Sequence, residues 1–468
     1  RMAMDAVIDE RTLREIYLTG FEIAVKEGKS KAIMSSYNRV NGTYANENKH
    51  LLTDILREEW GFDGMVVSDW GGSNDAVKAV EAGANLEMPN CGYGSAREIV
   101  KAVKDGTLSE SVLDERVCEL VKVIMDLKDK KVMVVGTGIS GTGAIDLLNK
   151  VGADCIIYDG NEKLSTEDVV KKLGGNKAQI IIGQLPEGIT DKVELLVISP
   201  GVPIDSPIVE LFEKAGVPVW GEIELAYNYD KGKIVAITGT NGKTTTTALV
   251  GQIIKAYNEK TFVVGNIGNS YTGEVLKTTE DSYTVAEISS FQLETVHEFH
   301  PVVSAILNIT PDHLNRHHTM ECYAHTKERI AKNQNKSDVC VLNMEDEELY
   351  RFGKECNASV VWFSSRRKPC KGAYLDGNNI RYTDGVTDKI MLNVHDMNLL
   401  GTHNYENVCA AIAMTKAVGI PDDIIIEQIK NFKAVEHRIE YVATKNGVWY
   451  YNDSKGTNPE ASVKAIEA

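Results

Sequence analysis

The sequence predicts an α/β protein with several domains, and three observations support this prediction. Two stretches, 131–150 and 233–257, each run from a β-rich segment through a glycine turn into a helical pattern. Strand-like and helix-like segments also alternate along much of the remaining chain. The length of 468 residues exceeds what one hydrophobic core usually serves and suggests about three domains.

The composition limits the partners and the compartment. The chain carries 51 basic and 67 acidic residues, a net charge of −16, which argues against a general nucleic-acid or anionic-membrane partner. No apolar run is long enough to span a bilayer, and the N-terminal RMAMDAVIDERTL has acids where a signal peptide needs an apolar core. The eight cysteines include no CxxC pair, so idle thiols in a reducing compartment are expected. These features predict a cytoplasmic protein, and the opening Arg1 suggests a piece of a longer one.

Residues 1–129 alternate between helical and strand-like patterns. The expected strands are 32–37, 64–71 and 84–88, and the expected helices are 13–25, 51–60 and 76–82. The strand over 64–71, GMVVSDWG, reads as buried and ends near an acid, Asp69. This segment is therefore expected to be α/β.

Three strings in the same segment, SYNRVNG, LLTDILREEWGFDGMVVSDWG and AGANLEMP, resemble glycoside hydrolase family 3, the β-glucosidase-like enzymes. The resemblance implies a partial (β/α)₈ barrel fragment with Asp69 as the glycosidase nucleophile. Glycosidase chemistry needs a second carboxylate, but the domain that would carry the acid/base is missing, and Asn85 stands where the family usually has an acid. We expect a catalytically inactive fragment, joined as a genuine fusion or by an accident of gene assembly; a β-glucosidase-type glycosidase is the alternative.

Residues 130–230 begin with a dinucleotide-binding pattern. Strand-like KVMVV (131–135) leads into the complete GxGxxG turn GTGISG (136–141), then a helix over 144–150 and a second strand that ends at Asp159. Such a turn lets backbone N–H groups hold a diphosphate, and an acid at the second strand's tip can reach a ribose hydroxyl. An NAD(P)-binding protein is therefore a serious alternative, although no recognisable hydride-transfer residues follow and a second nucleotide turn lies further on.

That second turn lies in Lys233–Tyr257, KIVAITGTNGKTTTTALVGQIIKAY, and predicts an ATP site. A strand over 234–237 enters the turn GTNG, and a helix follows. Backbone N–H groups at the helix N-terminus would cradle phosphates, Lys243 would neutralise their charge, and Thr244 could hold Mg²⁺. The spacing departs from the standard P-loop, which has a glycine where Ile237 stands.

Later strands are expected to bring further groups to this turn. A strand that begins at 283 ends at Glu287, whose carboxylate could reach the Mg²⁺ held by Thr244, since this ion prefers oxygen ligands plus phosphate. A strand over 304–310 leads to His313, which on the sequence alone is either a metal ligand or an ordinary loop histidine. His317 and His318 are expected at the surface. The stretch 345–396 carries no motif.

Six ordered motifs resemble the Mur ligase family, and most closely its D-glutamate-adding branch. They are SPG (199–201), GTNGKTT (239–245), EISSFQLE (287–294), NITPDHLNRH (308–317), HRIE (437–440) and NDSKGTN (452–458). The resemblance implies a Rossmann-like UDP-sugar-binding domain over 130–230, a P-loop α/β ATP-binding domain over 231–436 and the truncated start of a Rossmann-like ligase domain over 437–468. Residues 1–129 would be a separate fragment. Because the rest of the last domain carries most of the D-glutamate pocket in the family, the truncation puts turnover in doubt more than nucleotide binding.

The implied reaction is ATP-dependent amide formation in peptidoglycan precursor synthesis. The carboxylate of UDP-N-acetylmuramoyl-L-alanine would take the γ-phosphate of ATP as an acyl phosphate, and the amine of D-glutamate would displace that phosphate. The resemblance implies two Mg²⁺ ions as cofactors and a monomeric enzyme. A relative that adds another amino acid is the alternative within the family.

The resemblance also assigns roles to individual residues. Lys327 would be carbamylated, which turns a cation into a carboxylate able to support a second Mg²⁺. Asn161 stands where some relatives have an arginine, so the uracil contacts are less defined than the diphosphate contacts. The catalytic residues would be Lys243, His313, Lys327, Arg438 and Lys455, and the metal ligands Thr244, Glu287, His313 and Lys327. The ATP contacts would be Gly239, Thr240, Asn241, Gly242, Lys243, Thr244, Thr245, His403, Asn404, Asn407, Arg438 and Asp453. The UDP-substrate contacts would be Gly138, Ile139, Ser140, Asp159, Gly201, Asn266, Ser289 and Gln292.

Overall fold

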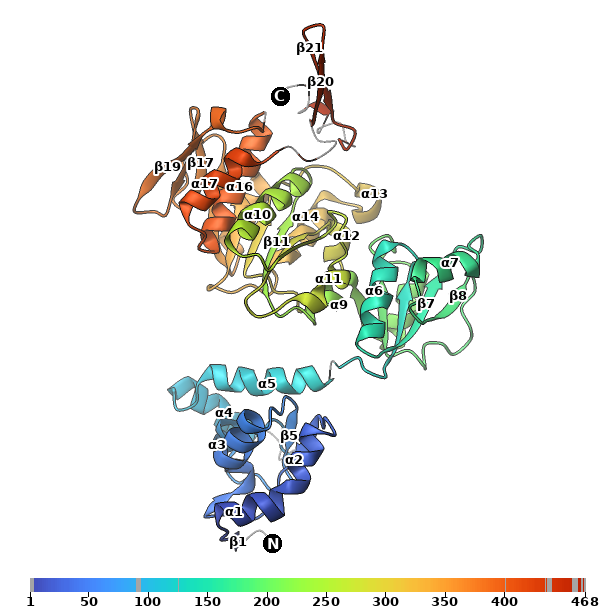
Figure 1. Cartoon of the computed structure of the whole chain (residues 1–468), viewed down its shortest axis with the longest axis vertical. Coiled ribbons are helices and arrows are strands. Elements are labelled where there is room, and N and C mark those ends of the chain that lie inside the picture. The colour runs from blue at the N-terminus through green and yellow to red at the C-terminus, as the bar shows by residue number, and fades with distance from the viewer. Residues whose placement is uncertain are drawn as a thin grey trace. The chain divides into compact units, whose positions relative to one another are not determined.

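The computed structural model describes residues 4–89, 94–124, 126–399, 401–433, 435, 440–456, 462–463 and 466. The chain divides into two compact units, Arg1–Leu127 (unit 1) and Lys128–Ala468 (unit 2). Figure 1 shows both units, coloured from blue at the N-terminus to red at the C-terminus. Among the described residues, no helix is both long enough and apolar enough to cross a membrane.

Unit 1 is mainly helical, with short strands. Its helical segments are α1 (Glu10–Thr12), η1 (Leu13–Leu18), α2 (Thr19–Lys26), η2 (Ala45–Glu47), η3 (His50–Glu59), α3 (Ala76–Ala82), α4 (Gly94–Asp105) and α5 (Glu110–Ile124). Its strands are β1 (Asp5–Ala6), β2 (Ala32–Met34), β3 (Arg39–Val40), β4 (Thr43–Tyr44) and β5 (Met65–Val67). The helix predicted over 76–82 is confirmed.

The strands of unit 1 are shorter than the sequence suggests. β2 and β5 pair in parallel, with Ile33 opposite Val66. The strand predicted over 84–88 is wrong, because this segment forms only a single parallel bridge, between Leu86 and Val67. The described residues of unit 1 therefore hold two short parallel ladders (β1–β3 and β2–β5), one antiparallel ladder (β3–β4) and one bridge rather than a closed barrel, and a barrel origin for this unit stays a prediction.

Asn85 explains part of this irregularity. Its Oδ1 accepts hydrogen bonds from Val66 N at 2.7 Å and from Arg57 Nη2 at 2.9 Å. Its Nδ2 donates to Arg116 O at 2.7 Å and to Glu119 Oε2 at 2.8 Å. Both ends of the amide are thus bonded within the fold, and the side chain acts as a structural clamp between β5 and α5.

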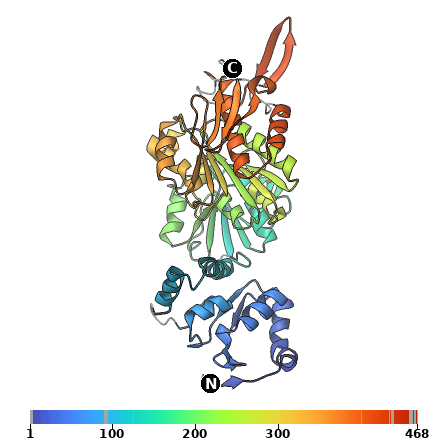
Figure 2. The same cartoon turned by 90° about the vertical axis from the view of Figure 1, so that its left-hand side faces the viewer.

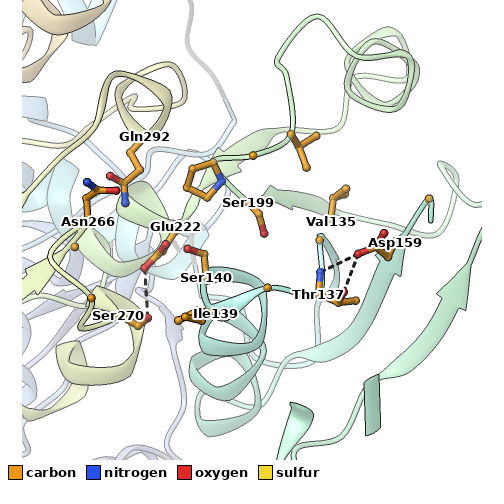
Figure 3. Close-up of a pocket in the computed structure, with 18 residues that line it drawn as sticks. Val135, Thr137, Ile139, Ser140, Asp159, Ser199, Glu222, Asn266, Ser270 and Gln292 are labelled. Carbon is orange, nitrogen blue, oxygen red and sulfur yellow. Dashed lines mark hydrogen bonds between the residues drawn. The ribbon is translucent and has the colours of Figure 1, made fainter. Parts of the chain in front are cut away.

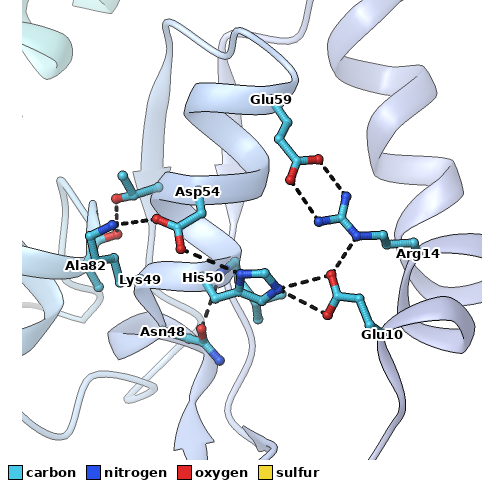
Figure 4. Close-up of polar contacts among 10 residues, drawn as sticks. Glu10, Arg14, Asn48, Lys49, His50, Asp54, Glu59 and Ala82 are labelled. Atoms are coloured by element: carbon cyan, nitrogen blue, oxygen red, sulfur yellow. Dashed lines mark hydrogen bonds and ion pairs between the residues drawn. The ribbon is translucent and has the colours of Figure 1, made fainter.

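A surface network joins the first helices of unit 1 to η3 (Figure 4). Arg14 lies between Glu59, with bonds of 2.6 and 2.8 Å, and Glu10 at 2.6 Å. His50 Nε2 lies 3.1 Å from both carboxylate oxygens of Glu10, and its Nδ1 lies 3.6 Å from Asp54. Exposed ion pairs contribute little each, so this network orients the helices while the apolar cluster around Leu52, Leu56, Phe62 and Val66 supplies the core.

Unit 2 contains a five-stranded parallel sheet of the Rossmann type. Its order is β10-β9-β6-β7-β8, with β6 (Lys131–Val135), β7 (Asp154–Asp159), β8 (Gln179–Ile182), β9 (Leu195–Ile198) and β10 (Val219–Gly221). The helices are α6 (Ile139–Lys150), α7 (Thr166–Leu173), α8 (Pro207–Lys214) and α9 (Glu222–Tyr227). The chain order reverses at β6, which pairs with β7 on one side and β9 on the other. Ligands of such sheets bind outside the carboxyl ends of the strands at this reversal.

A larger sheet follows, in the order β12-β13-β11-β14-β15-β16-β17-β18-β19. It is parallel from β12 to β17, and β18 and β19 add antiparallel strands. Its strands are β11 (Lys233–Thr238), β12 (Thr261–Gly265), β13 (Tyr283–Glu287), β14 (Val303–Ile306), β15 (Val339–Asn343), β16 (Ser359–Ser364), β17 (Gly372–Asp376), β18 (Asn379–Thr383) and β19 (Asp388–Asn393). β11 again stands at a reversal, between β13 and β14.

Helices cover this sheet, and Figure 2 shows the strands of unit 2 between them. They are α10 (Lys243–Tyr257), α11 (Tyr271–Glu274), η4 (Val275–Lys277), α12 (Ser290–Leu293), α13 (Leu314–His317), α14 (Met320–Glu328), η5 (Arg329–Ala331), α15 (Glu347–Glu355), η6 (Val394–Asp396), α16 (Thr402–Ala417) and α17 (Asp422–Asn431). The apolar positions predicted for α10, Leu249, Val250, Ile253 and Ile254, are all fully buried. The strands β20 (Glu440–Lys445) and β21 (Val448–Asn452) form an antiparallel hairpin.

Candidate functional site

A cavity of about 630 Å³ opens at the carboxyl ends of the five-stranded sheet (Figure 3). The turns after β6, β7 and β9 line it on one side, and residues of the larger sheet's domain line it on the other. The lining residues are Val135, Gly136, Thr137, Gly138, Ile139, Ser140, Asp159, Gly160, Ser199, Pro200, Gly201, Val202, Glu222, Gly265, Asn266, Gly268, Ser270 and Gln292. The cavity therefore lies where the strand order reverses at β6, which is the usual ligand site of such sheets.

The glycine turn of this cavity is fixed by close backbone contact. Gly138 is the N-cap of α6, whose N-terminus can hold an anion. A Cβ at Gly141 would lie 1.9 Å from the Gly136 carbonyl oxygen, so only glycine fits there. Asp159 accepts hydrogen bonds from Thr137 N at 3.2 Å and from Thr137 Oγ1 at 2.8 Å, which ties the tip of β7 to the turn.

Most of the residues predicted to contact the UDP-substrate lie in this lining. They are Gly138, Ile139, Ser140, Asp159, Gly201, Asn266 and Gln292. Ser289 is the exception, because it is the N-cap of α12: its Oγ accepts from Gln292 N at 3.3 Å, and its N–H donates to Gln292 Oε1 at 2.9 Å. Ser289 thus holds Gln292 from behind the cavity wall.

The sequence reasoning missed four polar residues of the lining: Thr137, Ser199, Glu222 and Ser270. Ser199 Oγ is buried with no hydrogen-bond partner, which a ligand in the cavity could supply. Ser199 belongs to the SPG motif, and Glu222 comes directly after a strand-like VWG, so both carried a usable signal in their position at strand ends.

The second glycine turn, between β11 and α10, is held by Asn308. Asn308 Oδ1 accepts from Thr240 N at 3.1 Å and from Asn241 N at 2.8 Å, and its Nδ2 donates to Asn241 O at 3.1 Å. Gly242 has φ 85, and a Cβ there would lie 2.3 Å from Asn407 Oδ1. Left-handed backbone and this contact both require glycine, so the turn is shaped before any ligand arrives.

Two lysines converge on this turn. Lys243 Nζ donates to Gly239 O at 2.9 Å and to Thr240 O at 2.8 Å. Lys327, on α14, donates to the same Gly239 oxygen at 2.7 Å and is 1% exposed. Burial, followed by the charge of Lys243, holds the pKa of Lys327 well below its usual range. The ammonium group of Lys243 beside a helix N-terminus makes a site for a polyanion.

The predicted metal ligands gather at the same edge of the sheet, with differing burial. Glu287 ends β13 and is 1% exposed; its Oε1 accepts from Asn266 Nδ2 at 2.8 Å, while Oε2 has no partner. Thr244 lies in the first turn of α10. His313 has φ 51, a half-exposed side chain and a ring centroid 4.9 Å from that of Phe291.

The loop that carries His313 is tied to the cavity at the five-stranded sheet. Arg316 forms an ion pair with Glu294, and both side chains are largely buried. The same guanidinium donates to Val202 O at 2.9 Å, in the turn after β9 that lines the cavity. Arg316 therefore connects the larger sheet's domain to the turn after β9 that lines the cavity.

His317 corrects an expectation, while His318 fits it. His317 was expected at the surface but is 2% exposed, with Nε2 3.0 Å from Ser290 Oγ and its ring against Phe291 and Tyr323. Burial lowers its pKa to about 4, and the charge of Lys327 adds to this. His318 has a 70% exposed side chain. His317 is buried because it is the last residue of α13 and its side chain packs against α12.

The remaining predicted ATP contacts lie on α16 and after β21. Asn407 Nδ2 donates to Asn404 Oδ1 at 3.2 Å, and Asn407 lies against Gly242 of the turn; His403 lies one residue before Asn404. Asp453 and Lys455 lie in the turn after β21, and Lys455 is exposed. Arg438 lies outside the described residues. The geometry thus brings α16 to the glycine turn.

Asp69, the predicted glycosidase nucleophile, follows β5 in unit 1. It is half-buried, and its Oδ1 accepts from Trp70 N at 2.7 Å. The place of the usual family acid is taken by Asn85, whose hydrogen bonds are all structural. The geometry shows Asp69 as the stabiliser of its own turn.

Comparison with known families agrees with the division of the chain. Residues 130–221 match the model for the Mur ligase MurD-like N-terminal domain, and 237–415 match that for the Mur ligase middle domain. Residues 4–123 match the glycosyl hydrolase family 3 N-terminal domain. Among solved structures, a UDP-N-acetylmuramate:L-alanyl-gamma-D-glutamyl-meso-diaminopimelate ligase from Neisseria meningitides is similar over 66% of this chain and 99% of its own, with 16% identity and a TM-score of 0.47.

Two curated relatives are much closer in sequence. The UDP-N-acetylmuramoylalanine--D-glutamate ligase of Lachnospira eligens is 82% identical over 344 residues, which are 74% of this chain and 76% of the relative. The enzyme of the same name from Lachnoclostridium phytofermentans is 53% identical over 345 residues, with the same coverage of both chains. The two glycine turns, the lysine pair and this identity agree: the chain belongs to the UDP-N-acetylmuramoylalanine--D-glutamate ligase family of the Mur ligases.

Proposed function

We propose that this chain joins D-glutamate to UDP-N-acetylmuramoyl-L-alanine in an ATP-dependent reaction that passes through an acyl phosphate. The observation that carries the proposal is the convergence of Lys243 and Lys327 on the Gly239 carbonyl at the start of α10. The reaction brings an anionic carboxylate and a polyphosphate together, so their mutual repulsion must be offset. Lys243, on a rigid anion-binding turn, supplies positive charge for that offset, and Lys327 lies beside it as the support for a second Mg²⁺.

The proposed domains follow the two sheets. Residues 130–230 bind the UDP-sugar, 231–436 bind ATP, 437–468 begin the ligase's C-terminal domain, and 1–129 are the partial glycoside hydrolase barrel fragment. The two reversal points, at β6 and β11, support separate sites for the two nucleotides. We also propose that the enzyme acts as a monomer.

In the ATP site, the backbone N–H groups at the start of α10 would hold the phosphates. Lys243 would exchange its two carbonyl partners for phosphate oxygens, and Thr240, Asn241 and Thr245 would lie along the same turn. The side chains of His403, Asn404 and Asn407 would face the adenine end. Asp453, Lys455 and Arg438 would act from the C-terminal segment, Lys455 and Arg438 on the phosphoryl group being transferred.

The residues present fit Mg²⁺. The described residues hold no cluster of three or more His, Cys, Asp or Glu side chains that could cage a metal, and magnesium commonly binds through one or two protein ligands, waters and phosphate. Glu287 Oε2 is buried without a hydrogen-bond partner, so it is available as an oxygen ligand. Thr244 and His313 would be the other protein ligands of the ion. Bound Mg²⁺ would supply charge neutralisation at the transferring phosphoryl group. Two ions are proposed, the second supported by carbamylated Lys327.

Lys327 is suited to carbamylation. A lysine held below its usual pKa is a neutral amine for a larger fraction of the time, and the neutral amine is the form that reacts with carbon dioxide. A carbamate keeps one N–H, so the bond to Gly239 O could persist while the new carboxylate projects from the nitrogen.

The cavity at the five-stranded sheet would hold the sugar nucleotide. The turn at Gly138, Ile139 and Ser140 would bind the diphosphate, and Asp159 the ribose or uracil. Gly201, Asn266 and Gln292 would line the path toward the ATP site, with Ser289 holding Gln292 in place. Family membership favours this occupant over NAD(P), the other ligand of such a turn.

The test is phosphate release by the purified chain with ATP, Mg²⁺, UDP-N-acetylmuramoyl-L-alanine and D-glutamate. Lys243→Ala is expected to abolish release because it removes the phosphate cation. Lys255→Ala changes an exposed lysine in the last turn of the same helix and serves as the matched control. Unchanged release by Lys243→Ala would contradict the proposal. Replacing D-glutamate with other amino acids tests the alternative specificity.

A further inference from the structure

Glu222 is a buried acid in the wall of the sugar-nucleotide cavity. It stands at the junction of β10 and α9 and is 4% exposed (Figure 3). Ser270 Oγ donates to its Oε1 at 3.3 Å. Burial raises the pKa of Glu222, while hydrogen bonding from Ser140, Ser270 and the Tyr271 N–H opposes the rise. Burial therefore works against the charged form of this carboxyl group, and the hydrogen bonds from its neighbours support that form.

The groups around Glu222 come from both domains of unit 2. Ser140 lies in the first turn of α6, beside the glycine turn, and Ser270 is the N-cap of α11. α6 and α11 pack closely, because a Cβ at Gly143 of α6 would lie 2.6 Å from Ser270 Oγ and 2.8 Å from Thr272 Oγ1. Glu222 thus closes a junction between the diphosphate turn and the ATP-binding domain.

The charges of the cavity wall matter for a diphosphate. The lining includes two acids, Asp159 and Glu222, and no lysine, arginine or histidine among the described residues. Asp159 is bonded to Thr137 at the end of β7. The contacts of Glu222 from α6 and α11 are hydroxyls and an N–H, and Glu224 of its own helix binds the N–H groups of 297–299 instead. An ionised Glu222 would repel the diphosphate, and a neutral one would not.

We propose that Glu222 is a positioning residue that, as a neutral carboxylic acid, holds Ser140 against Ser270 when a diphosphate occupies the cavity. This inference rests on the proposed function. A neutral carboxyl group has one O–H donor besides its acceptors, so it can accept from one hydroxyl and donate to the other. Substrate entry then takes a fraction of a proton from solvent onto Glu222, and binding weakens as pH rises through the pKa of the occupied state.

The test is calorimetric binding of UDP-N-acetylmuramoyl-L-alanine to the full chain between about pH 6 and pH 9, in buffers of different ionisation enthalpy. We expect the wild type to take up a fraction of a proton and to lose about tenfold in affinity across this range. Glu222→Gln keeps the shape and neutral charge, so its affinity should stay within about threefold of the wild type at low pH, without proton uptake. Glu222→Ala should bind about tenfold more weakly at every pH. Glu210→Gln removes an exposed acid on α8 and is the matched control.

Three other outcomes would contradict this role of Glu222. A loss of more than about tenfold for Glu222→Gln at every pH would show an ionised anchor and overturn the inference. Unchanged affinity in Glu222→Ala, with only a lower unfolding midpoint, would show a merely structural acid and overturn it as well. No binding by the wild type would overturn the proposed function, and this inference with it.

Discussion

Lys243 and Lys327 donate to the same oxygen, the carbonyl of Gly239, at 2.9 and 2.7 Å. They come from helices that begin more than seventy residues apart, α10 and α14. Burial and the charge of Lys243 both favour the neutral amine form of Lys327. A polyphosphate bound at this turn would give Lys243 a partner of opposite charge.

The proposed carbamylation of Lys327 can be tested by nuclear magnetic resonance. In ¹³C-bicarbonate, the wild type should show a carbamate carbon resonance that Lys327→Arg lacks, because arginine does not form a carbamate under these conditions. The same variant should lose at least about 100-fold in phosphate release, since the second carboxylate is missing. Lys336→Arg, an exposed neighbour, should keep both the resonance and the activity. A resonance that survives in Lys327→Arg would place the carbamate elsewhere.

Gly141→Ala should destabilise unit 2 strongly. The new Cβ would lie 1.9 Å from the Gly136 carbonyl, so the turn must move, at a cost of about 3 kcal/mol. Urea unfolding followed by circular dichroism measures this cost. Gly138→Ala is the control in the same turn, because a Cβ there meets nothing within 4 Å and its φ is −80. Equal unfolding free energies for the two variants would refute the contact.

Removal of Arg316 should weaken both stability and substrate binding. Arg316→Met leaves Glu294 buried without its partner, at a cost of about 3–5 kcal/mol. It also frees the turn at Val202, so the affinity for UDP-N-acetylmuramoyl-L-alanine should fall. Adding Glu294→Gln to this variant should restore much of the stability but not the affinity. If the double variant recovers both, the contact with Val202 contributes nothing to binding.

His317 should make folding stability depend on pH. Its pKa is about 4 in the folded chain against 6.5 for an ordinary histidine, so below pH 6.5 the unfolded chain binds a proton that the folded chain does not. Stability from the neutral ring is therefore full above pH 6.5 and is lost as pH falls toward 4. At pH 5 the loss is about 2 kcal/mol. Urea unfolding at pH 7 and pH 5 should show it in the wild type and not in His317→Gln.

Unit 1 is expected to have no glycosidase activity, despite its resemblance to glycoside hydrolase family 3. Asp69 binds its own turn, and Asn85 replaces an acid. The purified chain should release no detectable nitrophenol from aryl β-glucosides. Release that Asp69→Asn abolishes would revive the alternative function.

Local patterns in the sequence were sufficient for the elements around the two turns. The strand and helix that flank Gly239–Gly242 were predicted within a residue or two, because a β-rich run, the glycines and a helical apolar stripe agree there. The cavity lining followed from the same logic, since the ends of β6, β7 and β9 were visible as strand ends. Residues from strand-end motifs were therefore found from sequence.

Residues whose roles depend on packing between distant segments were not found from the sequence. Glu222 was overlooked because its burial arises only when α6 meets α11, and His317 was misplaced because its neighbour α12 is not adjacent in the sequence. The strand expected over 84–88 forms a single bridge because the Asn85 side chain occupies the Val66 N–H. The antiparallel strands β18 and β19 were not predicted, because the stretch that forms them carries no motif.

The ladder between β11 and β13 has a consequence for how this enzyme family can vary. Glu287 sits opposite Ile237 on one side and Gly265 on the other, so neighbouring strands set its position. Successive side chains of a strand alternate between faces. One extra or missing residue in β13 would send the carboxylate to the far face, whereas an exchange of side chain would leave its position intact. Length differences among relatives should therefore fall in the connecting loops and spare these strands.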